Sequence, residues 1–335
     1  MLDFAAFKKA LEPFSNIAIT APAGADGDSV GTQCAMRELL LQIYPNKRFR
    51  IVNEEPCPLR YMMLPDSKHF EVSEDILKGP KTDWPDCMVC VDGGFSRIGD
   101  DTTQLWTAAQ KRGQVDHHAI GATANYDFRL YNPEAASTTE IIFNFTHGLK
   151  LQLTPSIAQA IYVGLIFDTG LFKHSNTKPD TLRIGADLLA TGFNHTETAE
   201  KAMLIRSPGA WKMLRDVMRG AHFDLDGRYV WGTLRYPEFM EAGGDADDRE
   251  GLIDNLFLTQ GCEIAAFYFE RKPQEWKMSF RSRGWDVASL AQSLNPNGGG
   301  HKLAAGCSLE GPESEVLAKC HQALKTLLER KRSTA

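Results

Sequence analysis

Four short clusters of acidic and histidine side chains in the first half of the sequence are suited to metal binding and acid–base chemistry. Each alone would be an ordinary turn or helix cap, but all four follow segments patterned as strands or helices. Two divalent ions about 3.5–4 Å apart can neutralise a phosphate ester and activate a water between them. The pattern therefore predicts metal-dependent phosphate-ester hydrolysis. The clusters are Asp26 with Asp28, Asp92, Asp116 with His117 and His118, and Asp168.

The spacing within these clusters sets conditions on the backbone. Asp26 and Asp28 are two residues apart, so an extended turn would direct both carboxylates to one side. Asp92 follows a different expected strand, and we expect its carboxylate to bridge two ions. His117 and His118 are adjacent, and adjacent side chains of a strand point to opposite faces. Both can reach one site only if a turn begins there, and residues 119–122 offer one.

Strand and helix patterns alternate along the first half. Strands are expected over 16–21, 49–52 and 88–91, with another just before residue 115, and a helix over 34–44. This alternation predicts an α/β fold with a mostly parallel sheet flanked by helices. Ligands bind at the carboxyl ends of parallel strands, which is where these clusters fall. Further helices are expected over 133–149, 155–167 and 180–189.

The second half predicts a smaller α/β domain with a mixed sheet. Strands are expected over 229–236, 262–270 and 276–281, helices over 248–258 and 314–328, and a Gly-rich turn over 295–306. We therefore expect a metal-binding domain over 1–192, a helical linker over 193–220 and a substrate-binding domain over 221–335.

Composition limits the partners of the chain. The formal net charge is −6, so no global basic field attracts long nucleic acids, and a nucleic-acid partner should be short and gripped locally. No stretch approaches the roughly 18 apolar residues that span a bilayer, so we expect no membrane partner and a cytoplasmic protein. Seven cysteines should be reduced thiols there. Cys87 and Cys90 form a C-x-x-C, which fits a buried strand better than a redox or zinc site because no second such pair exists.

The order of the motifs resembles the DHH phosphoesterase family, named for the triplet Asp116-His117-His118. The first, second and fourth motifs of that family resemble ADGDSVGT, VCVDGG and GLIFDTGLFKHSNT, and AASTTEII from Ala135 resembles its helix motif. MSFRSRG and GGGHKLAAG resemble the family's C-terminal DHHA1 domain. The pattern is most similar to the oligoribonuclease/pAp-phosphatase branch. This implies a phosphoesterase acting on short oligonucleotides (nanoRNA), dinucleotides or 3′-phosphoadenosine 5′-phosphate (pAp), in some cases as a homodimer.

The resemblance also implies residue roles. Two divalent ions are expected, manganese first, with magnesium or iron as alternatives, and His118 would contact the scissile phosphate or assist proton transfer, oriented by Asp116. The metal ligands would be Asp26, Asp28, Asp92, His117 and Asp168. In the second domain, Arg281 and Arg283 would bind the substrate's terminal phosphate, and His301 would bind a phosphate or stack on a base. The backbone would approach the substrate at Gly298, Gly299 and Gly300.

One position departs from the family pattern. Pro22 stands where the family has a histidine, four residues before Asp26, and Ala25 replaces the usual proline. Proline cannot bind a metal, so one ion would lose a nitrogen ligand. That ion could bind weakly, recruit another ligand, or leave a site that works with one ion. The alternative is that the protein is catalytically weakened and acts as a nucleotide-binding regulatory protein. A third possible function, exonuclease activity on long single strands, is disfavoured by the acidic net charge of the chain.

Overall fold

The computed structural model describes residues 2–118, 126–243, 246–249 and 251–329. The turn expected at 119–122 and the last six residues lie outside these ranges. The chain divides into two compact units, Met1–Ile205 and Arg206–Ala335. The segment 193–220, expected as a linker, is therefore shared between the units.

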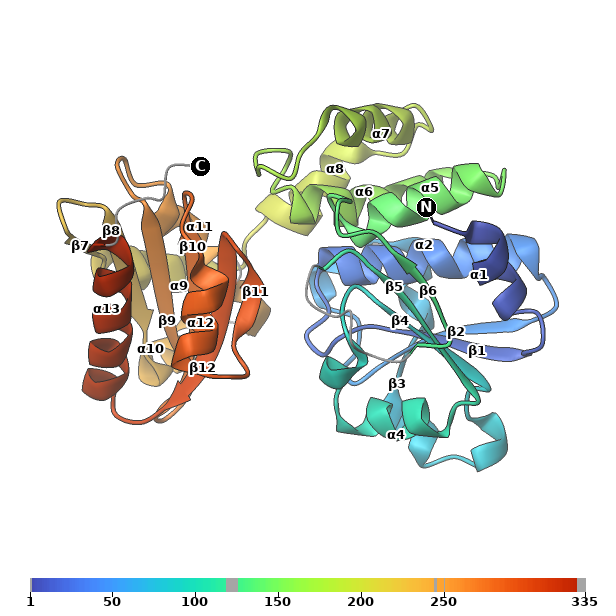
Figure 1. The fold of residues 1–335 in the computed structure, drawn as a ribbon, viewed down its shortest axis with the longest axis horizontal. Helices are drawn as coiled ribbons and strands as arrows, with labels where there is room; N and C mark the ends of the chain where they lie inside the picture. The colour runs from blue at the N-terminus through green and yellow to red at the C-terminus, as the bar shows by residue number, and fades with distance from the viewer. Residues whose placement is uncertain (1, 119–125, 244–245, 250, 330–335) are drawn as a thin grey trace. The chain divides into compact units, whose positions relative to one another are not determined.

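A six-stranded, wholly parallel sheet forms the centre of the first unit (Figure 1). This confirms the predicted fold class. Two strands were missed because they are short or polar, namely β3 and β6. In sheet order the strands are β3 (Phe70–Val72), β2 (Arg48–Asn53), β1 (Asn16–Thr20), β4 (Cys87–Val91), β5 (Lys111–Asp116) and β6 (Phe128–Tyr131).

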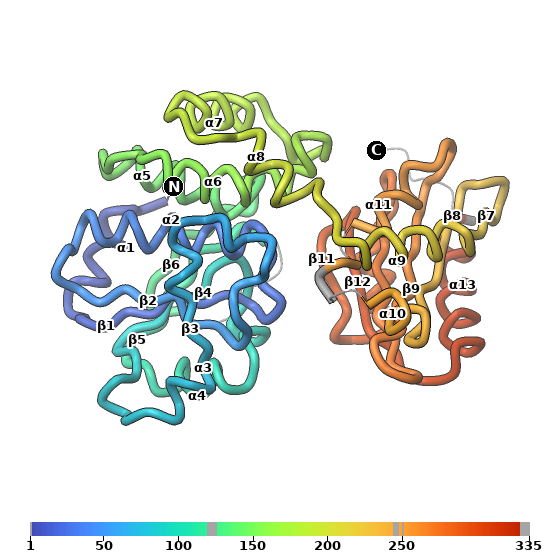
Figure 2. Tube along the Cα trace, turned by 180° about the vertical axis from the view of Figure 1, so that it is seen from behind, coloured from blue at the N-terminus to red at the C-terminus, as the bar shows by residue number. Residues whose placement is uncertain are grey.

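Helices cover both faces of this sheet. One face carries α2 (Gly27–Ile43), with α5 (Thr138–Gly148) and α6 (Pro155–Asp168) packed against α2 (Figure 1). The other carries α3 (Ser73–Leu77) and α4 (Asp100–Ala108) (Figure 2). Alternate strand residues serve the two faces, since Ile17 and Ile19 join the α2 layer while Ala18 joins the α4 layer. This two-residue period is the expected consequence of strand geometry.

The C-x-x-C pair follows the same period. Cys87 lies in the α2 layer and Cys90 in the α4 layer, so the two thiols lie on opposite faces of β4. Burial raises the pKa of both thiols, that of Cys87 to about 12. All seven cysteines are free and buried. The buried-strand interpretation of this pair is therefore confirmed.

The remaining helices of the first unit begin and end with local signals. α5 starts at Thr138 rather than at Pro133, because Ser137 is its N-cap and accepts a hydrogen bond from the Glu140 amide. α7 (Pro179–Leu189) begins with proline in its first turn, where the missing amide hydrogen costs nothing. α8 (His195–Ala199) and a short π-helix (Glu200–Leu204) follow.

The second unit contains a mixed six-stranded sheet, as predicted. β8 and β9 are parallel and the other pairs are antiparallel. The region expected to be a Gly-rich turn instead forms a β-hairpin of β11 and β12. In sheet order the strands are β11 (Gly299–His301), β12 (Ala304–Glu310), β10 (Glu275–Ser282), β9 (Ile264–Lys272), β8 (Tyr229–Leu234) and β7 (His222–Asp224).

Two helical layers enclose this second sheet. α12 (Val287–Leu294) and α13 (Glu313–Glu329) cover one face (Figure 1), while α9 (Pro208–Arg219), α10 (Tyr236–Ala242) and α11 (Leu252–Phe257) cover the other (Figure 2). Beneath α13, Tyr229 Oη lies 2.7 Å from Tyr268 Oη and 2.8 Å from His321 Nδ1. These buried polar atoms therefore satisfy one another.

Candidate metal centre

Asp92 lies at the carboxyl end of β4 and is nearly inaccessible to solvent. Its φ of 57° is in the left-handed region, which turns the chain sharply after the strand. Its Oδ2 accepts a hydrogen bond from Ser29 Oγ at 2.6 Å, and its Oδ1 accepts one from Thr138 Oγ1 at 3.0 Å. Two helices therefore hold this carboxylate in place.

Both histidines of the triplet approach the same oxygen of Asp92. β5 ends at Asp116, so the strict alternation of a strand no longer applies to the next two residues. His117 Nε2 lies 3.8 Å and His118 Nδ1 lies 3.7 Å from Asp92 Oδ1. Burial opposes the charge of Asp92, but the two histidines and the hydrogen bonds outweigh it and lower its pKa.

His117 presents its Nε2 nitrogen to the acidic cluster. Its Nδ1 donates to the Ala135 carbonyl oxygen at 3.1 Å, while Nε2 lies 3.0 Å from Asp168 Oδ2. In the neutral ring a lone pair would then face a carboxylate, so a proton or a cation must lie between them. Burial disfavours the imidazolium, yet Asp168, Asp28 and Asp92 raise the pKa of His117 to about 11. A metal ion can replace this proton.

Asp28 is fully buried in the first turn of α2 and binds the amino end of α5. Its Oδ2 accepts a hydrogen bond from the Thr138 amide at 2.5 Å. Its Oδ1 accepts from the Thr139 amide at 2.9 Å and from Thr139 Oγ1 at 2.8 Å. Burial, with repulsion from Asp92 and Asp168, raises the pKa of Asp28 well above its usual range.

The donor set fits a divalent cation. One ligand atom each from Asp28, Asp92 and His117 lie within 4.8 Å of one another, and all three residues are buried. Asp168, the last residue of α6, adds a carboxylate beside His117. Two or three carboxylate oxygens with one imidazole nitrogen suit manganese, magnesium or iron.

Asp26 is placed differently from the other predicted ligands. It is the N-cap of α2, and its Oδ1 accepts hydrogen bonds from the Asp28 amide at 3.0 Å and the Ser29 amide at 3.1 Å. It belongs to none of the close ligand groups found among the described residues. Pro22 is buried, and its ring contacts Gly93, where an added Cβ would lie 2.8 Å from Pro22 Cγ.

Asp116 and His118 form a second close group with Asp92. Asp116 Oδ1 accepts hydrogen bonds from His118 Nδ1 at 2.8 Å and from the His118 amide at 3.0 Å. Its Oδ2 accepts from Gln114 Nε2 at 3.0 Å, and the same amide group donates to the Gly93 carbonyl oxygen. Burial opposes protonation of His118, but Asp116 and Asp92 outweigh this effect and raise the pKa of His118.

Several side chains that hold this centre were not predicted. Ser29, Gln114 and Thr138 each hydrogen-bond a predicted site residue, as described above. The AASTTEII motif included Thr138, but only the strand order reveals that α5 begins beside Asp28 and Asp92. His174 Nδ1 donates to the Asp168 carbonyl oxygen at 3.0 Å and so caps the end of α6.

The predicted residues of the second unit lie around the end of β10 and in the β11–β12 hairpin. Arg281 Nε lies 3.4 Å from Asp254 Oδ1 of α11. Arg283 donates from Nε to the Cys262 carbonyl oxygen at 3.1 Å and from a terminal nitrogen to the Phe257 carbonyl oxygen at 3.2 Å. Its guanidinium carbon also lies 4.4 Å from the centre of the Phe257 ring. Arg283 therefore ties the segment just before β9 to the end of α11.

The glycines of the hairpin differ in the space around them. A Cβ at Gly298 would lie 2.5 Å from the Ala291 carbonyl oxygen, and one at Gly300 would lie 2.6 Å from that of Ala304. Gly300 also has a φ of 137°. At Gly299 the nearest atom would be 3.9 Å away. His301 ends β11 and is exposed. Packing within the second unit thus accounts for two of the three glycines.

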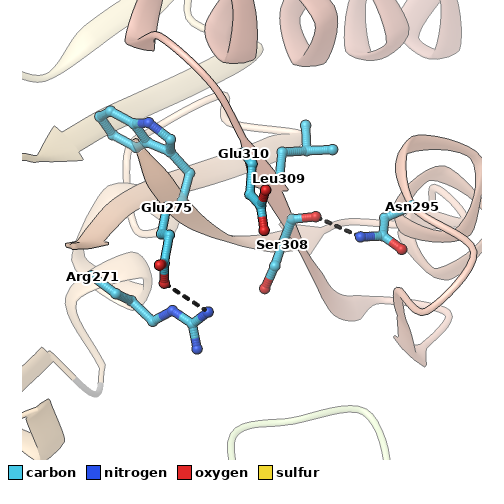
Figure 3. Close-up of a pocket in the computed structure, with 7 residues that line it drawn as sticks. Arg271, Glu275, Asn295, Ser308, Leu309 and Glu310 are labelled. Carbon is cyan, nitrogen blue, oxygen red and sulfur yellow. Dashed lines mark hydrogen bonds and ion pairs between the residues drawn. The ribbon is translucent and has the colours of Figure 1, made fainter. Parts of the chain in front are cut away.

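A cavity of about 230 Å³ lies at the other end of β10 (Figure 3). Arg271 pairs with Glu275 at 3.9 Å, and Asn295 Nδ2 donates to the Ser308 carbonyl oxygen at 2.7 Å. Glu275 pairs with Glu310 across the sheet, at the opposite end of β10 from Arg281. This cavity therefore does not include the predicted substrate-binding residues.

The parallel sheet with this acidic and histidine centre at its carboxyl edge defines a metal-dependent hydrolase. Family comparison supports this class. Residues 16–165 match the DHH family N-terminal domain, and residues 230–330 match the DHHA1 domain. The two matches cover most of the chain, which belongs to the DHH/DHHA1 phosphoesterase family.

Individual relatives agree with this assignment. The bifunctional oligoribonuclease and PAP phosphatase NrnA of Thermus thermophilus is 28% identical over 85% of this chain and 82% of that protein. The protein of the same name from Bacillus subtilis is 26% identical over 85% of this chain and 86% of that protein. A crystal structure of an exopolyphosphatase-related protein from Bacteroides fragilis has the same fold, with a TM-score of 0.87 and 22% identity over 96% of this chain and 95% of that one.

Proposed function

We propose that this protein hydrolyses short oligoribonucleotides, dinucleotides and pAp-type nucleotides at a divalent-metal centre formed by Asp28, Asp92, His117 and Asp168. The observation that carries the proposal is the convergence of buried ligand atoms from α2, β4 and the end of β5 within 4.8 Å. The names of the relatives from Thermus thermophilus and Bacillus subtilis support the substrate class. When bound, divalent ions neutralise the phosphate and activate the attacking water.

His118 is suited to the proton step. Its Nδ1 donates to Asp116, which fixes the orientation of the ring, and in this proposal Nε2 is the nitrogen that contacts the substrate. Hydrolysis forms a bond from water oxygen to phosphorus and breaks the ester P–O bond. The leaving oxygen takes a proton, which His118 Nε2 would donate. Gln114 supports this geometry because it holds the second oxygen of Asp116.

The second unit would bind the remainder of the substrate. Arg281 offers a guanidinium for a terminal phosphate, and exposed His301 offers an imidazole for a phosphate or base. Arg283 is engaged with two carbonyl oxygens, so in this proposal it positions α11 beside Arg281 in addition to adding charge. At Gly299 an added Cβ would make only an ordinary contact, 3.9 Å from Gln292 Nε2, so in this proposal the backbone there contacts the substrate, with Gly298 and Gly300 shaping the hairpin.

The direct test uses purified protein with Mn²⁺ against a dinucleotide, pAp and a generic chromogenic phosphodiester. We expect hydrolysis of the first two, and a loss of about 10²–10³-fold in Asp92→Asn, the size of losing a key electrostatic group. Asp100→Asn is the matched control, since Asp100 is an exposed carboxylate of α4. Absence of turnover with every divalent metal would refute the proposal, and would favour the weakened regulatory protein that Pro22 alone suggests.

The cellular location and the oligomeric state of the protein are part of the same proposal. None of the described helices is long and apolar enough to cross a bilayer. Seven free, buried cysteines support a reducing compartment, and we place the protein in the cytoplasm. The expected homodimer would be tested by light scattering coupled to size-exclusion chromatography.

A further inference from the structure

The two carboxylate oxygens of Asp92 lie in different surroundings. Oδ1 lies near His117 and His118 and accepts the Thr138 hydroxyl. Oδ2 accepts the Ser29 hydroxyl, and the amide of Ser29 donates to Asp26. The first side has an imidazole nitrogen and several carboxylates close by, whereas the second leads to Asp26. This difference bears on how many ions the centre holds.

The first side is equipped to hold a cation firmly. Asp28, Asp92 and His117 offer ligand atoms within 4.8 Å of one another, and Asp168 Oδ2 lies 3.0 Å from His117 Nε2. Asp28, Asp92 and His117 are each held by a hydrogen bond outside the ligand group. Asp28 is bound to the first turn of α5 and His117 to the Ala135 carbonyl oxygen. Such outer partners commonly change metal affinity about 10- to 100-fold.

The second side lacks these features. Pro22, which packs on Gly93 next to Asp92, has a hydrocarbon ring without any donor atom. Asp26 Oδ1 already caps α2 through two amide hydrogen bonds. Among the described residues, the ligands that Asp26 and Asp92 would offer a cation there are oxygens, completed by water or phosphate. All-oxygen sites favour hard ions such as Mg²⁺ and Mn²⁺ over softer ones.

We propose that the centre is asymmetric, with one divalent ion bound tightly by Asp28, Asp92, His117 and Asp168, and a second bound only weakly at Asp26 because Pro22 supplies no ligand. The inference rests on the proposed function, since it describes the metal centre of that hydrolase. It predicts that a nitrogen ligand at position 22 would convert the weak site into a tight one.

The proposed asymmetry is tested by titrating metal-stripped protein with Mn²⁺. The concentration of free Mn²⁺ at each step is measured by electron paramagnetic resonance. The wild-type protein should bind one equivalent tightly and a second at least about tenfold more weakly. Losing even a residue that only supports a metal ligand lowers metal affinity about 10- to 100-fold. Pro22→His should tighten the second equivalent about tenfold or more. Pro22→Ala removes the ring without adding a ligand, and it should leave the second equivalent weak.

A further variant assigns the weak site to Asp26. Asn is as good an N-cap as Asp, so Asp26→Asn keeps α2 intact while removing the charge. It should abolish the weak equivalent and preserve the tight one. Two equally tight equivalents in the wild-type protein, or a Pro22→His variant that folds with unchanged binding, would overturn the inference. Hydrolysis at saturating Mn²⁺ is measured in parallel, because its absence refutes the proposed function whatever the stoichiometry.

Discussion

The Nδ1 atom of His118 lies 2.8 Å from Oδ1 of Asp116, and the backbone amide of His118 donates to the same oxygen. The carboxylate thereby fixes both the ring and the chain that carries it. One orientation of the imidazole results, with Nε2 directed away from Asp116. The proton step of the proposed hydrolysis depends on this pair.

Replacing Asp116 with Asn should separate orientation from metal binding. An amide in this position either loses its acceptor toward His118 or opposes the amide of Gln114, which donates to the other oxygen. We expect kcat to fall by about 10²–10⁴, the range for loss of general acid catalysis. KM and the tight Mn²⁺ equivalent should change little. Steady-state kinetics on a dinucleotide check this, and a kcat within twofold of wild type would contradict it.

The hydroxyl of Thr139 should contribute to stability through Asp28. It donates at 2.8 Å to a fully buried carboxyl group, and leaving such an acceptor short of a partner costs about 1–3 kcal/mol. Thr139→Val has nearly the same shape without the hydroxyl. We expect its urea unfolding midpoint to fall accordingly, while Thr139→Ser, which keeps the donor, should lose less. Equal losses of stability in the two variants would contradict this prediction, because the methyl group would then contribute as much as the hydroxyl.

Close packing of α2 against α6 depends on Gly31. A Cβ there would lie 2.4 Å from the Ala160 carbonyl oxygen, so Gly31→Ala must separate the helices that carry Asp28 and Asp168. Overpacking of this kind costs about 1–3 kcal/mol, and Mn²⁺ affinity should fall with stability. In the control Gly220→Ala, the nearest atom is 3.5 Å away. A thermal midpoint unchanged by Gly31→Ala would show that the helices move apart without penalty.

His321 should make the second unit sensitive to acid. Burial lowers its pKa from the ordinary value of 6.5; Lys325 and His222 lower it further, against the opposing effect of Asp224. The unfolded chain therefore takes up a proton at higher pH than the folded one. The stability that neutral His321 contributes is complete above about pH 6.5, and it is lost as the pH falls toward the pKa of His321 in the folded protein.

His321→Gln tests this dependence, since glutamine keeps a polar partner for Tyr229 and does not titrate. The urea midpoint of the wild-type protein should fall between pH 7 and pH 5, and that of the variant should fall less. Midpoints that run parallel over this range would exclude His321 as the source.

Much of the fold could be predicted because apolar runs marked β1, β2 and β4 and the strands β8 to β10. Missed strands such as β3 and β7 have only three residues each, too few to show an alternating pattern, and each pairs with a longer neighbour. The hairpin of β11 and β12 looked like a turn because its glycines suit turns. In the structure, Gly298 and Gly300 are needed instead where α12 and β12 leave no room for a Cβ.

The candidate site was predicted in its acidic and histidine residues but not in their surroundings. Asp92, His117 and Asp168 are far apart in sequence, and their motifs alone suggested that they converge. Ser29, Gln114 and Thr138 carry no such pattern, because ordinary polar residues become partners only when the strand order brings them close. The binding of Asp28 to the amino end of α5 is likewise a product of tertiary structure, whereas Asp26 caps α2 through local contacts with the next residues of the chain.

The burial of every thiol has a practical consequence. Cys87 and Cys90 point into opposite apolar layers, and the other five cysteines are also enclosed, in both units. A thiol reagent can reach such groups only when the surrounding layer opens. The rate of alkylation, followed residue by residue with mass spectrometry, would then time the opening of each layer. The seven native cysteines can therefore report local unfolding in both units, without any introduced cysteine.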